Sequence, residues 1–469
     1  MADMRRHSPL RTQGKSGLSF VSSESGMDIE SSLIPKIAVG LVSLYALKRR
    51  LAKRKTDGKA RAIILPGKLL MGQDKWLGGV CSPDGKYIYG VPGHAKRVLK
   101  ITAATGEYEL IGPEYKGPFK WLRGVEVPAS VTGSVQTIYC MPSNGGKYGV
   151  LKILPDSDLV TTIGGPFPGD WMWHGGVLSE VDNCIYAIPC NADGVLKIDP
   201  RTDKVEIIGG PWPEEPKRQK WYGGIIGYDG NIDGIPQCAS GVLKINPHTQ
   251  KCTVIGKDEV SSHGIGEKMG WKWHGGFCDK NTNVIYGIAS NADAILKIDT
   301  KTDKVTTIGY PLNRNWAHRQ DGKYKYLGGA LGGDGYCYFF PCDAEQVLRV
   351  DLETDECKLI GPKFMEGMNK WQNGFLAKDG AIYAIPQRAH GILKVTPSKD
   401  PKNVEASVEY LYFHNTNSSV IDEDEAEYFK LQKDKFEAAV MAPDGDMYCM
   451  PLRAKRIVKI VPAHISPDK

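Results

Sequence analysis

A 37-residue segment that begins at Trp173 recurs at Trp273 with 21 identical residues, and weaker copies run from Trp76 nearly to the C-terminus. Each copy contains the tetrad VLKI or a close variant, and the third residue of that tetrad is basic. Eight such residues follow one another at spacings of 45 to 65 residues: Lys100, Lys152, Lys197, Lys244, Lys297, Arg349, Lys394 and Lys459. A period of this size indicates a repeat architecture, in which each unit is one supersecondary element.

Each unit can be divided into four short strands. The first follows an aromatic residue and a glycine pair, as in Trp76–Val80. An Asp-Gly turn, a strong hairpin signal, leads to a second strand that ends at a proline such as Pro92. VLKI is the third strand, and the fourth ends at a glycine such as Gly209. Four antiparallel strands without a helical period are typical of a propeller blade. We therefore predict an all-β, eight-bladed β-propeller, with seven blades and a degenerate extra copy as the alternative.

The two ends of the repeat region complement each other. The eighth unit stops after its third strand, at Val461-Pro462, and lacks a fourth. Residues 62–67, AIILPG, resemble fourth-strand endings such as Leu110–Pro113. We predict that 62–67 completes the last blade and closes the ring, so that the propeller spans 62–463.

The N-terminal segment differs in composition from the repeats. Residues 1–32 are rich in Ser, Arg and Gly and are predicted to be disordered or a targeting segment. Residues 33–55 hold an apolar run, Ile37–Leu47, followed by a basic cluster, and are predicted to form a short helix. The run is shorter than the roughly 18–20 residues that span a bilayer. A short or tilted membrane anchor, a cleaved mitochondrial-type presequence and a soluble interaction arm remain as alternatives. Three acidic residues count against a presequence: Glu24, Asp28 and Glu30.

Charge and cysteine content exclude several functional classes. The formal net charge is +6 over 469 residues, and much of it lies in the N-terminal segment, so no nucleic-acid partner is predicted. The 11 cysteines include no CxxC pair, which disfavours a disulfide framework or a zinc site. This favours an intracellular location, with an organellar membrane such as the mitochondrial or plastid membrane as an alternative. The N-glycosylation sequon at Asn417 argues against an intracellular location.

The candidate ligand-binding residues come from one repeat position and the position after it. If the first strand of each unit is innermost, the aromatic residue that precedes it would line an axial pocket. The alternative is that each aromatic packs between neighbouring blades. These candidates are Trp76, Trp121, Trp173, Trp221, Trp273 and Trp371, together with His174 and His274. The two histidines are two blades apart and are expected to be well separated. No catalytic residue, metal site or cofactor is predicted. The lysine of VLKI is expected to lay its stem over an aromatic ring.

The unit DG-x-IY-x-IP followed by VLKID-x-x-T-x-x-V-x-x-IG resembles the β-propeller superfamily in its kelch- and quinoprotein-like branches. It is similar to uncharacterised propeller-repeat proteins of algae and related protists, over roughly residues 62–463. The Asp199–Thr202 turn is similar to the docking turn of quinone-cofactor dehydrogenases. The calcium ligands, catalytic Asp and vicinal disulfide of those enzymes have no counterpart in this chain. The resemblance therefore implies the fold and no activity.

Regular repeats without a catalytic constellation predict a non-catalytic protein-interaction scaffold, as a subunit of a larger assembly. Its protein partners would bind the loop faces and the N-terminal arm, and residues 33–55 would tether it to a membrane. Insertions lengthen the loops at Lys257–Lys272, Arg314–Lys325 and Pro397–Lys435, and long loops on a rigid scaffold commonly bind partners. Two alternatives use the axial pocket: an enzyme of the propeller hydrolase or quinoprotein-like dehydrogenase kind, and a small-ligand-binding module.

Overall fold

The computed structural model describes residues 58–144, 148–263, 270–309, 311–312, 321–401, 404–415, 427 and 429–463. The chain divides into two compact units, of which one comprises Ala60–Ala463 and the other Met1–Lys59 with His464–Lys469. The predictions for residues 1–32 and 33–55 lie outside the described residues. No helix within the described ranges is long and apolar enough to cross a membrane.

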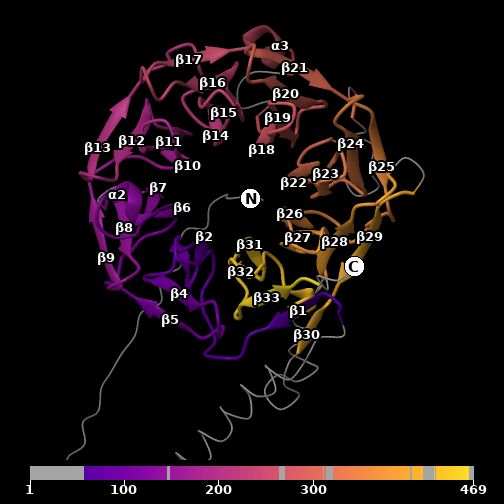
Figure 1. Ribbon diagram of the computed structural model, residues 1–469, viewed down its shortest axis with the longest axis horizontal. Helices are drawn as coiled ribbons and strands as arrows, with labels where there is room; N and C mark the ends of the chain where they lie inside the picture. Colours follow the sequence, from indigo (N-terminus) through magenta and orange to yellow (C-terminus); the bar gives the residue numbers. More distant parts are fainter. Residues whose placement is uncertain are drawn as a thin grey trace, which may run out of the picture. The chain divides into compact units, whose positions relative to one another are not determined.

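The unit Ala60–Ala463 is an eight-bladed β-propeller, as Figure 1 shows, and the predicted fold is confirmed. Seven of its sheets have four consecutive antiparallel strands. Blade 1 contains β2 (Trp76–Cys81), β3 (Tyr87–Pro92), β4 (Val98–Thr102) and β5 (Tyr108–Ile111). Blade 2 contains β6 (Trp121–Val127), β7 (Thr137–Pro142), β8 (Val150–Leu154) and β9 (Leu159–Ile163). Blade 3 contains β10 (Trp173–Leu178), β11 (Ile185–Pro189), β12 (Val195–Asp199) and β13 (Lys204–Ile208). Blade 4 contains β14 (Trp221–Ile226), β15 (Ile232–Pro236), β16 (Val242–Ile245) and β17 (Cys252–Ile255).

The remaining blades complete the ring. Blade 5 contains β18 (Trp273–Asp279), β19 (Val284–Ala289), β20 (Ile295–Asp299) and β21 (Lys304–Ile308). Blade 6 contains β22 (Tyr326–Leu331), β23 (Tyr336–Pro341), β24 (Val347–Asp351) and β25 (Cys357–Ile360). Blade 7 contains β26 (Trp371–Leu376), β27 (Ile382–Pro386), β28 (Ile392–Thr396) and β29 (Ser407–Leu411). Blade 8 contains β31 (Phe436–Met441), β32 (Met447–Pro451), β33 (Val458–Val461), β1 (Arg61–Ile64) and β30 (Phe413–Asn415). Two short helices lie between strands, α2 (Ala129–Thr132) and α3 (Lys257–Ser262).

The first strand of each blade lies innermost. The eight first strands contact one another in sequence, and β31 contacts β2 to close the circle. The residue before each aromatic also bonds to the preceding blade through its backbone. Lys272 N–H, for example, donates to the Gln237 carbonyl at 2.9 Å, and Lys75 N–H donates to Leu452 at 3.1 Å between the last blade and the first. These bonds join every blade to its neighbour around the axis.

Blade 8 is completed from both ends of the propeller. β1 pairs antiparallel with β33 and parallel with β30. The strand spans Arg61–Ile64, whereas the sequence placed it at 62–67, and Leu65 N–H still donates to Ile457 at 2.9 Å. The segment Pro397–Lys435, interpreted from the sequence as a loop, supplies the outer strand of blade 7 and β30.

The tryptophans lie in the interfaces between blades. Trp121 packs in a cluster that joins residues of blades 1 and 2, and Trp221 packs in one that joins blades 3 and 4. Their indole N–H groups donate to carbonyls next to the third strand, as from Trp273 to Ala294 at 2.9 Å. Buried indoles usually find such a partner. The tryptophans therefore bury a large apolar area and fix the distance between neighbouring blades.

The lysine of VLKI contacts its own blade, and in four blades it also contacts the next one. Lys152 Nζ lies 5.8 Å from the centre of the Tyr139 ring, which confirms the predicted contact with an aromatic. The same Nζ is 2.5 Å from Asp203 Oδ2 in blade 3, and Lys297 is likewise 2.6 Å from Asp355 in blade 6. This lysine therefore links two blades in blades 1, 2, 4 and 5, whereas in blades 3, 7 and 8 its ion pairs lie within its own blade.

A second set of lysines, not noticed in the sequence, precedes the aromatic residue. They are fully or almost fully buried: Lys75, Lys120, Lys220, Lys272, Lys325, Lys370 and Lys435, with Met172 at this position in blade 3. Apart from Lys220, their ammonium groups donate to backbone carbonyls, as from Lys272 Nζ to Ala239 of the preceding blade at 2.9 Å. Burial lowers the pKa of Lys75, Lys120 and Lys272 to about 8, and that of Lys435 to about 7. Burial also lowers the pKa of Lys220 and of Lys370.

Candidate functional site: the axial pocket

A bulge in the inner strands shapes the centre of the ring. In each blade the pairing with the second strand shifts just after the aromatic residue, as between Trp173 and Gly176. The residue two positions after the aromatic has positive φ in six blades, and four of these residues are glycine: Gly78, Gly175, Gly223 and Gly275. Glycine adopts this conformation without the steric cost of a side chain. The other two are Arg123, with φ 59°, and Asn373, with φ 56°.

Arg123 is the unusual residue of this set. Asparagine tolerates the left-handed region comparatively well, whereas arginine gains nothing locally that offsets the strain. Residues held in such sparsely populated regions cost about 1–3 kcal/mol and cluster at functional sites. Most other blades have glycine at this position, so the strained arginine indicates a candidate functional residue near the axis.

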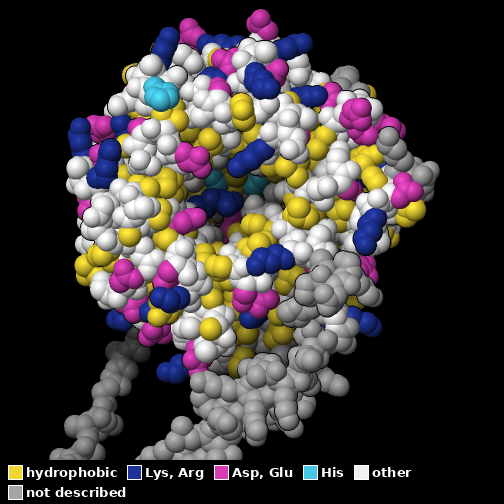
Figure 2. All heavy atoms as spheres, in the orientation of Figure 1, with side chains coloured by type: hydrophobic (Ala, Val, Ile, Leu, Met, Phe, Trp, Pro, Cys, Tyr) yellow, Lys and Arg dark blue, Asp and Glu magenta, His cyan; other side chains and the backbone are white. Residues whose placement is uncertain are grey.

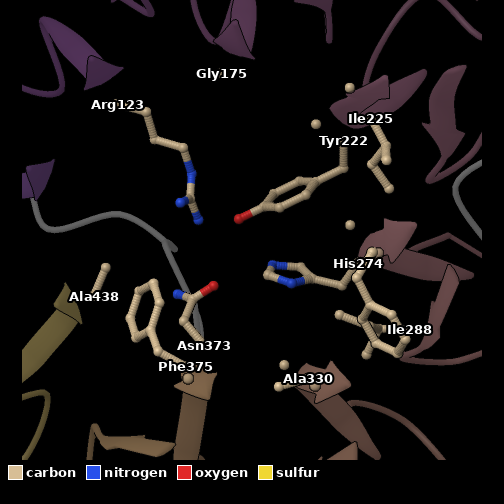
Figure 3. Close-up of a pocket in the computed structure, with 18 of the residues that line it drawn as sticks. Arg123, Gly175, Tyr222, Ile225, His274, Ile288, Ala330, Asn373, Phe375 and Ala438 are labelled. Atoms are coloured by element: carbon tan, nitrogen blue, oxygen red, sulfur yellow. The ribbon is translucent and has the colours of Figure 1, made fainter. Parts of the chain in front are cut away.

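A cavity of about 540 Å³ lies among the inner strands on the axis. That volume falls within the range of about 300–1,000 Å³ typical of small-molecule sites. Its polar lining residues are Arg123, His174, Tyr222, His274 and Asn373, most of which are labelled in Figure 3. Figure 2 shows basic and histidine side chains around the central hollow of the ring. No acidic side chain is among the described residues that line the cavity.

Three aromatic rings from successive blades stack along one side of the pocket. The ring centres of His174 and Tyr222 are 3.5 Å apart, and those of Tyr222 and His274 are 3.9 Å apart, both tilted by 33°. The expectation that the two histidines are well separated is therefore corrected. The inner strands converge on the axis, so Tyr222 of the blade between them bridges the gap.

Burial keeps the stacked histidines neutral. It lowers the pKa of His174 well below the usual value, and the Arg123 charge adds to the effect. Burial also lowers the pKa of His274. A neutral imidazole offers one hydrogen-bond donor and one acceptor. Neither ring nitrogen of His174 has a hydrogen-bond partner among the described residues, although the residue is only 3% exposed. An unpaired buried polar atom costs about 1–3 kcal/mol, so a water molecule or a ligand that bonds to this imidazole would be stabilised in the pocket.

Arg123 faces Tyr222, the middle ring of this stack, across the pocket. Figure 3 shows the guanidinium group pointing toward the phenol hydroxyl. Burial raises the pKa of Tyr222, so its hydroxyl stays a neutral donor near pH 7. Both side chains can therefore donate to the same small group.

One acidic residue directly follows the aromatic residue of an inner strand, and it is held in a polar network. Glu437 occupies the position of the histidines in blade 8 and is almost fully buried. Gln372 Nε2 donates to its Oε1 at 3.1 Å, and Gln387 donates in turn to Gln372 at 2.6 Å. Burial raises the pKa of Glu437.

Of the eight residues predicted from the sequence, the structure brings two into the cavity. His174 and His274 line it, whereas the six tryptophans do not. The lining residues missed in the sequence are Arg123, Tyr222 and Asn373. A signal was present for two of them, because aligning the repeats shows Arg123 and Asn373 interrupting the pattern Trp-x-Gly-Gly, whereas Tyr222 occupies its variable position.

Metal ligation has no geometric basis in the part of the chain that is described. No group of three or more His, Cys, Asp or Glu side chains there is arranged to hold a metal ion. His174 and His274 are separated by the Tyr222 ring and are not joined by a carboxylate. The pocket residues can offer hydrogen bonds and one positive charge.

No protein-family model matches this chain, and no curated protein matches it in sequence. Solved structures match it in fold. A streptogramin B lyase matches with TM-score 0.48 and 13% identity, over 85% of this chain and 97% of that one. Virginiamycin B lyase from Staphylococcus aureus matches with TM-score 0.49 and 12% identity, over 70% and 96%. Kuenenia stuttgartiensis hydrazine synthase matches with TM-score 0.47 and 11% identity, over 86% and 99%. At these identities the similarity concerns the propeller fold alone.

Proposed function

We propose that this protein binds a small anionic molecule in the axial pocket of its propeller. The observation that supports this most directly is Arg123. It places a positive charge in a cavity that no described acidic side chain lines, and it does so from a backbone conformation that favours glycine. This proposal develops the small-ligand-binding alternative of the sequence analysis.

The pocket offers donors suited to an oxyanion. A guanidinium group presents a planar fork that matches a carboxylate or phosphate with two parallel hydrogen bonds. Tyr222 and the two neutral imidazoles offer further donors without competing charge. Gly223 and Gly275 leave open space where a side chain would project, so a ligand can approach the backbone. Hydrogen bonds to charged groups contribute about 1.5–3 kcal/mol each in such a site.

Substituting Arg123 tests the proposal. Acetate, phosphate and sulfate are titrated into the protein by calorimetry, with Tyr and Trp fluorescence as a second readout. At least one of them is expected to bind, and Arg123→Gln is expected to weaken that binding about 100-fold, because two charge-assisted hydrogen bonds are lost. Arg97→Gln is the control, because Arg97 lies outside the cavity and pairs with Glu114. Equal affinity of Arg123→Gln and the wild type, or no binding of any of the three anions, would overturn the proposal.

Substituting Glu437 is expected to change the affinity for the anion in the opposite direction to substituting Arg123. The charge of Glu437 repels an anion at the axis, so Glu437→Gln is expected to strengthen binding several-fold. The network with Gln372 can still form, because a glutamine oxygen accepts the same hydrogen bond. Affinity for the anion that falls in this variant would contradict an anionic ligand.

The enzyme alternative gains no support from the pocket. A general base in nucleophilic catalysis is oriented by a third group. His174 has no such partner among the described residues.

A scaffold function remains a second proposal, together with its membrane tether and protein partners. What supports it is the sequence, namely the N-terminal apolar and basic segment and the long insertions. A closer kinship with kelch- or quinoprotein-like propellers and with algal or protist repeat proteins is likewise proposed from the repeat pattern. A stoichiometric partner that co-purifies with the full chain would support the scaffold, and recovery of the protein only as a free monomer would count against it.

A further inference from the structure

The axial pocket has an apolar lining in addition to its polar groups. Figure 3 shows Arg123 and Tyr222 on one side, with Phe375 and Ala330 across from them. Most of the apolar lining comes from blades 4 to 7, four or five positions after the aromatic residue of each inner strand. The residues at these positions are Ile225, Phe277, Ala330, Leu331, Phe375 and Leu376, and Ile288, Ala438 and Ala439 add to the apolar lining from other positions. Blades 1, 2, 3 and 8 carry valine at the first of these positions, and those valines do not line the cavity: Val80, Val125, Val177 and Val440.

The apolar lining is formed before any ligand binds. Phe277 packs against Phe339, with ring centres 5.7 Å apart, and against Tyr286 at 6.1 Å. Its own side chain remains only partly buried, as do those of Ile225 and Phe375. Fixed aromatic and aliphatic groups that still expose surface to a cavity gain free energy when a ligand covers them. A simple inorganic anion would leave this surface uncovered.

We infer that the ligand is an amphipathic monocarboxylate, with its carboxylate at Arg123 and Tyr222 and an apolar tail against Ile225, Phe277 and Phe375. This inference rests on the proposed anion-binding function and adds the chemical class of the ligand. Ile225, Phe277 and Phe375, which are larger than the valines at the same position of blades 1, 2, 3 and 8, select for the tail. The arginine of blade 2 and the aromatic stack of blades 3 to 5 select for the head group.

A homologous series of carboxylates tests the inference in the full-length protein. Acetate, butanoate, hexanoate and octanoate are titrated by calorimetry, with 1-octanol as the uncharged analogue. Each added methylene is expected to strengthen binding about fourfold until the tail fills the cavity, which corresponds to about 0.8 kcal/mol per buried CH₂. Octanol is expected to bind much more weakly than octanoate.

Matched variants separate the tail from the head group. Ile225→Thr is expected to weaken octanoate binding about four- to tenfold and to leave acetate unchanged. Val177→Thr at the same position of blade 3 is the control and should change neither. Arg123→Gln should weaken every member of the series by the same factor.

The outcomes distinguish the two proposals. Binding of acetate or phosphate without any gain along the series would overturn the amphipathic ligand and leave the anion site standing. Octanol that binds as tightly as octanoate would overturn the anion site. No binding of any carboxylate would overturn the amphipathic ligand, and the phosphate and sulfate titrations then decide the anion site separately.

Discussion

Deleting residues 61–65 is expected to lower the melting temperature by about 4–8 °C. These residues include Ile64, which is fully buried, and Leu65, which is 7% exposed. Their burial contributes about 1.5–3 kcal/mol each, so the deletion removes about 3–6 kcal/mol of stability. A propeller of about 400 residues unfolds with an entropy near 0.8 kcal/mol/K, which converts that loss into the stated shift. The deletion also leaves the edge of β33 unpaired, so aggregation on heating should increase.

Point substitutions check that the effect arises from the strand. Ile64→Ser should lower the melting temperature by a few degrees, whereas Leu69→Ser should not, because Leu69 is 48% exposed. Differential scanning calorimetry measures both variants beside the deletion. An unchanged melting curve for the deletion would show that β1 does not hold the ring closed.

The stability of the propeller is expected to rise from pH 7 to a maximum near pH 8.5–9 and then to fall steeply. The rise comes from the buried lysines. Their folded pKa values, about 8 for Lys75, Lys120 and Lys272 and about 7 for Lys435, lie below the unfolded value of 10.5. Between these values the unfolded chain binds more protons than the folded one, so stability increases with pH. The expected gain from pH 7 to 8.5 is on the order of 2–4 kcal/mol.

The fall comes from buried thiols and phenols, whose shifts have the opposite sign. Burial raises the pKa of Cys81, Cys184, Cys252 and Cys357 from 9.0 to about 11, and that of Cys190 to about 12. Burial also raises the pKa of tyrosines such as Tyr186. Above pH 9 the unfolded chain therefore loses protons that the folded chain retains, and stability decreases.

Urea unfolding at a series of pH values measures the profile. Lys435→Met should reduce the slope of stability against pH between 7 and 9 by about one proton. Methionine is tolerated at the same position of blade 3, where the chain has Met172. Lys433→Met, which changes an exposed lysine, should leave the slope unchanged. A profile that is flat between pH 7 and 9 would contradict the assigned lysine pKa values.

The axial site shows why the repeat pattern predicts some features and not others. The Trp-x-Gly-Gly pattern identified the inner strands correctly, but it drew attention to the tryptophans. Those residues are repeated because the blade interfaces need a large aromatic side chain, which in six blades is a tryptophan with the same indole hydrogen bond. Arg123 and Asn373 lie where the repeat is broken, and Tyr222 lies at its variable position, because a single site on the axis needs different groups from different blades.

By itself, the sequence determined the number of blades, the strands within each blade and the presence of a strand near the start that could complete the last one. These features depend on local hairpins and on alternation along each strand, which are encoded within about 50 residues. Only the tertiary structure decided that His174 and His274, 100 residues apart, stack on one tyrosine, and that seven lysines are buried beside backbone carbonyls. These contacts between distant residues depend on the radius of the closed ring and on the bulge that turns side chains toward its axis. Both are set by the packing of all eight blades together.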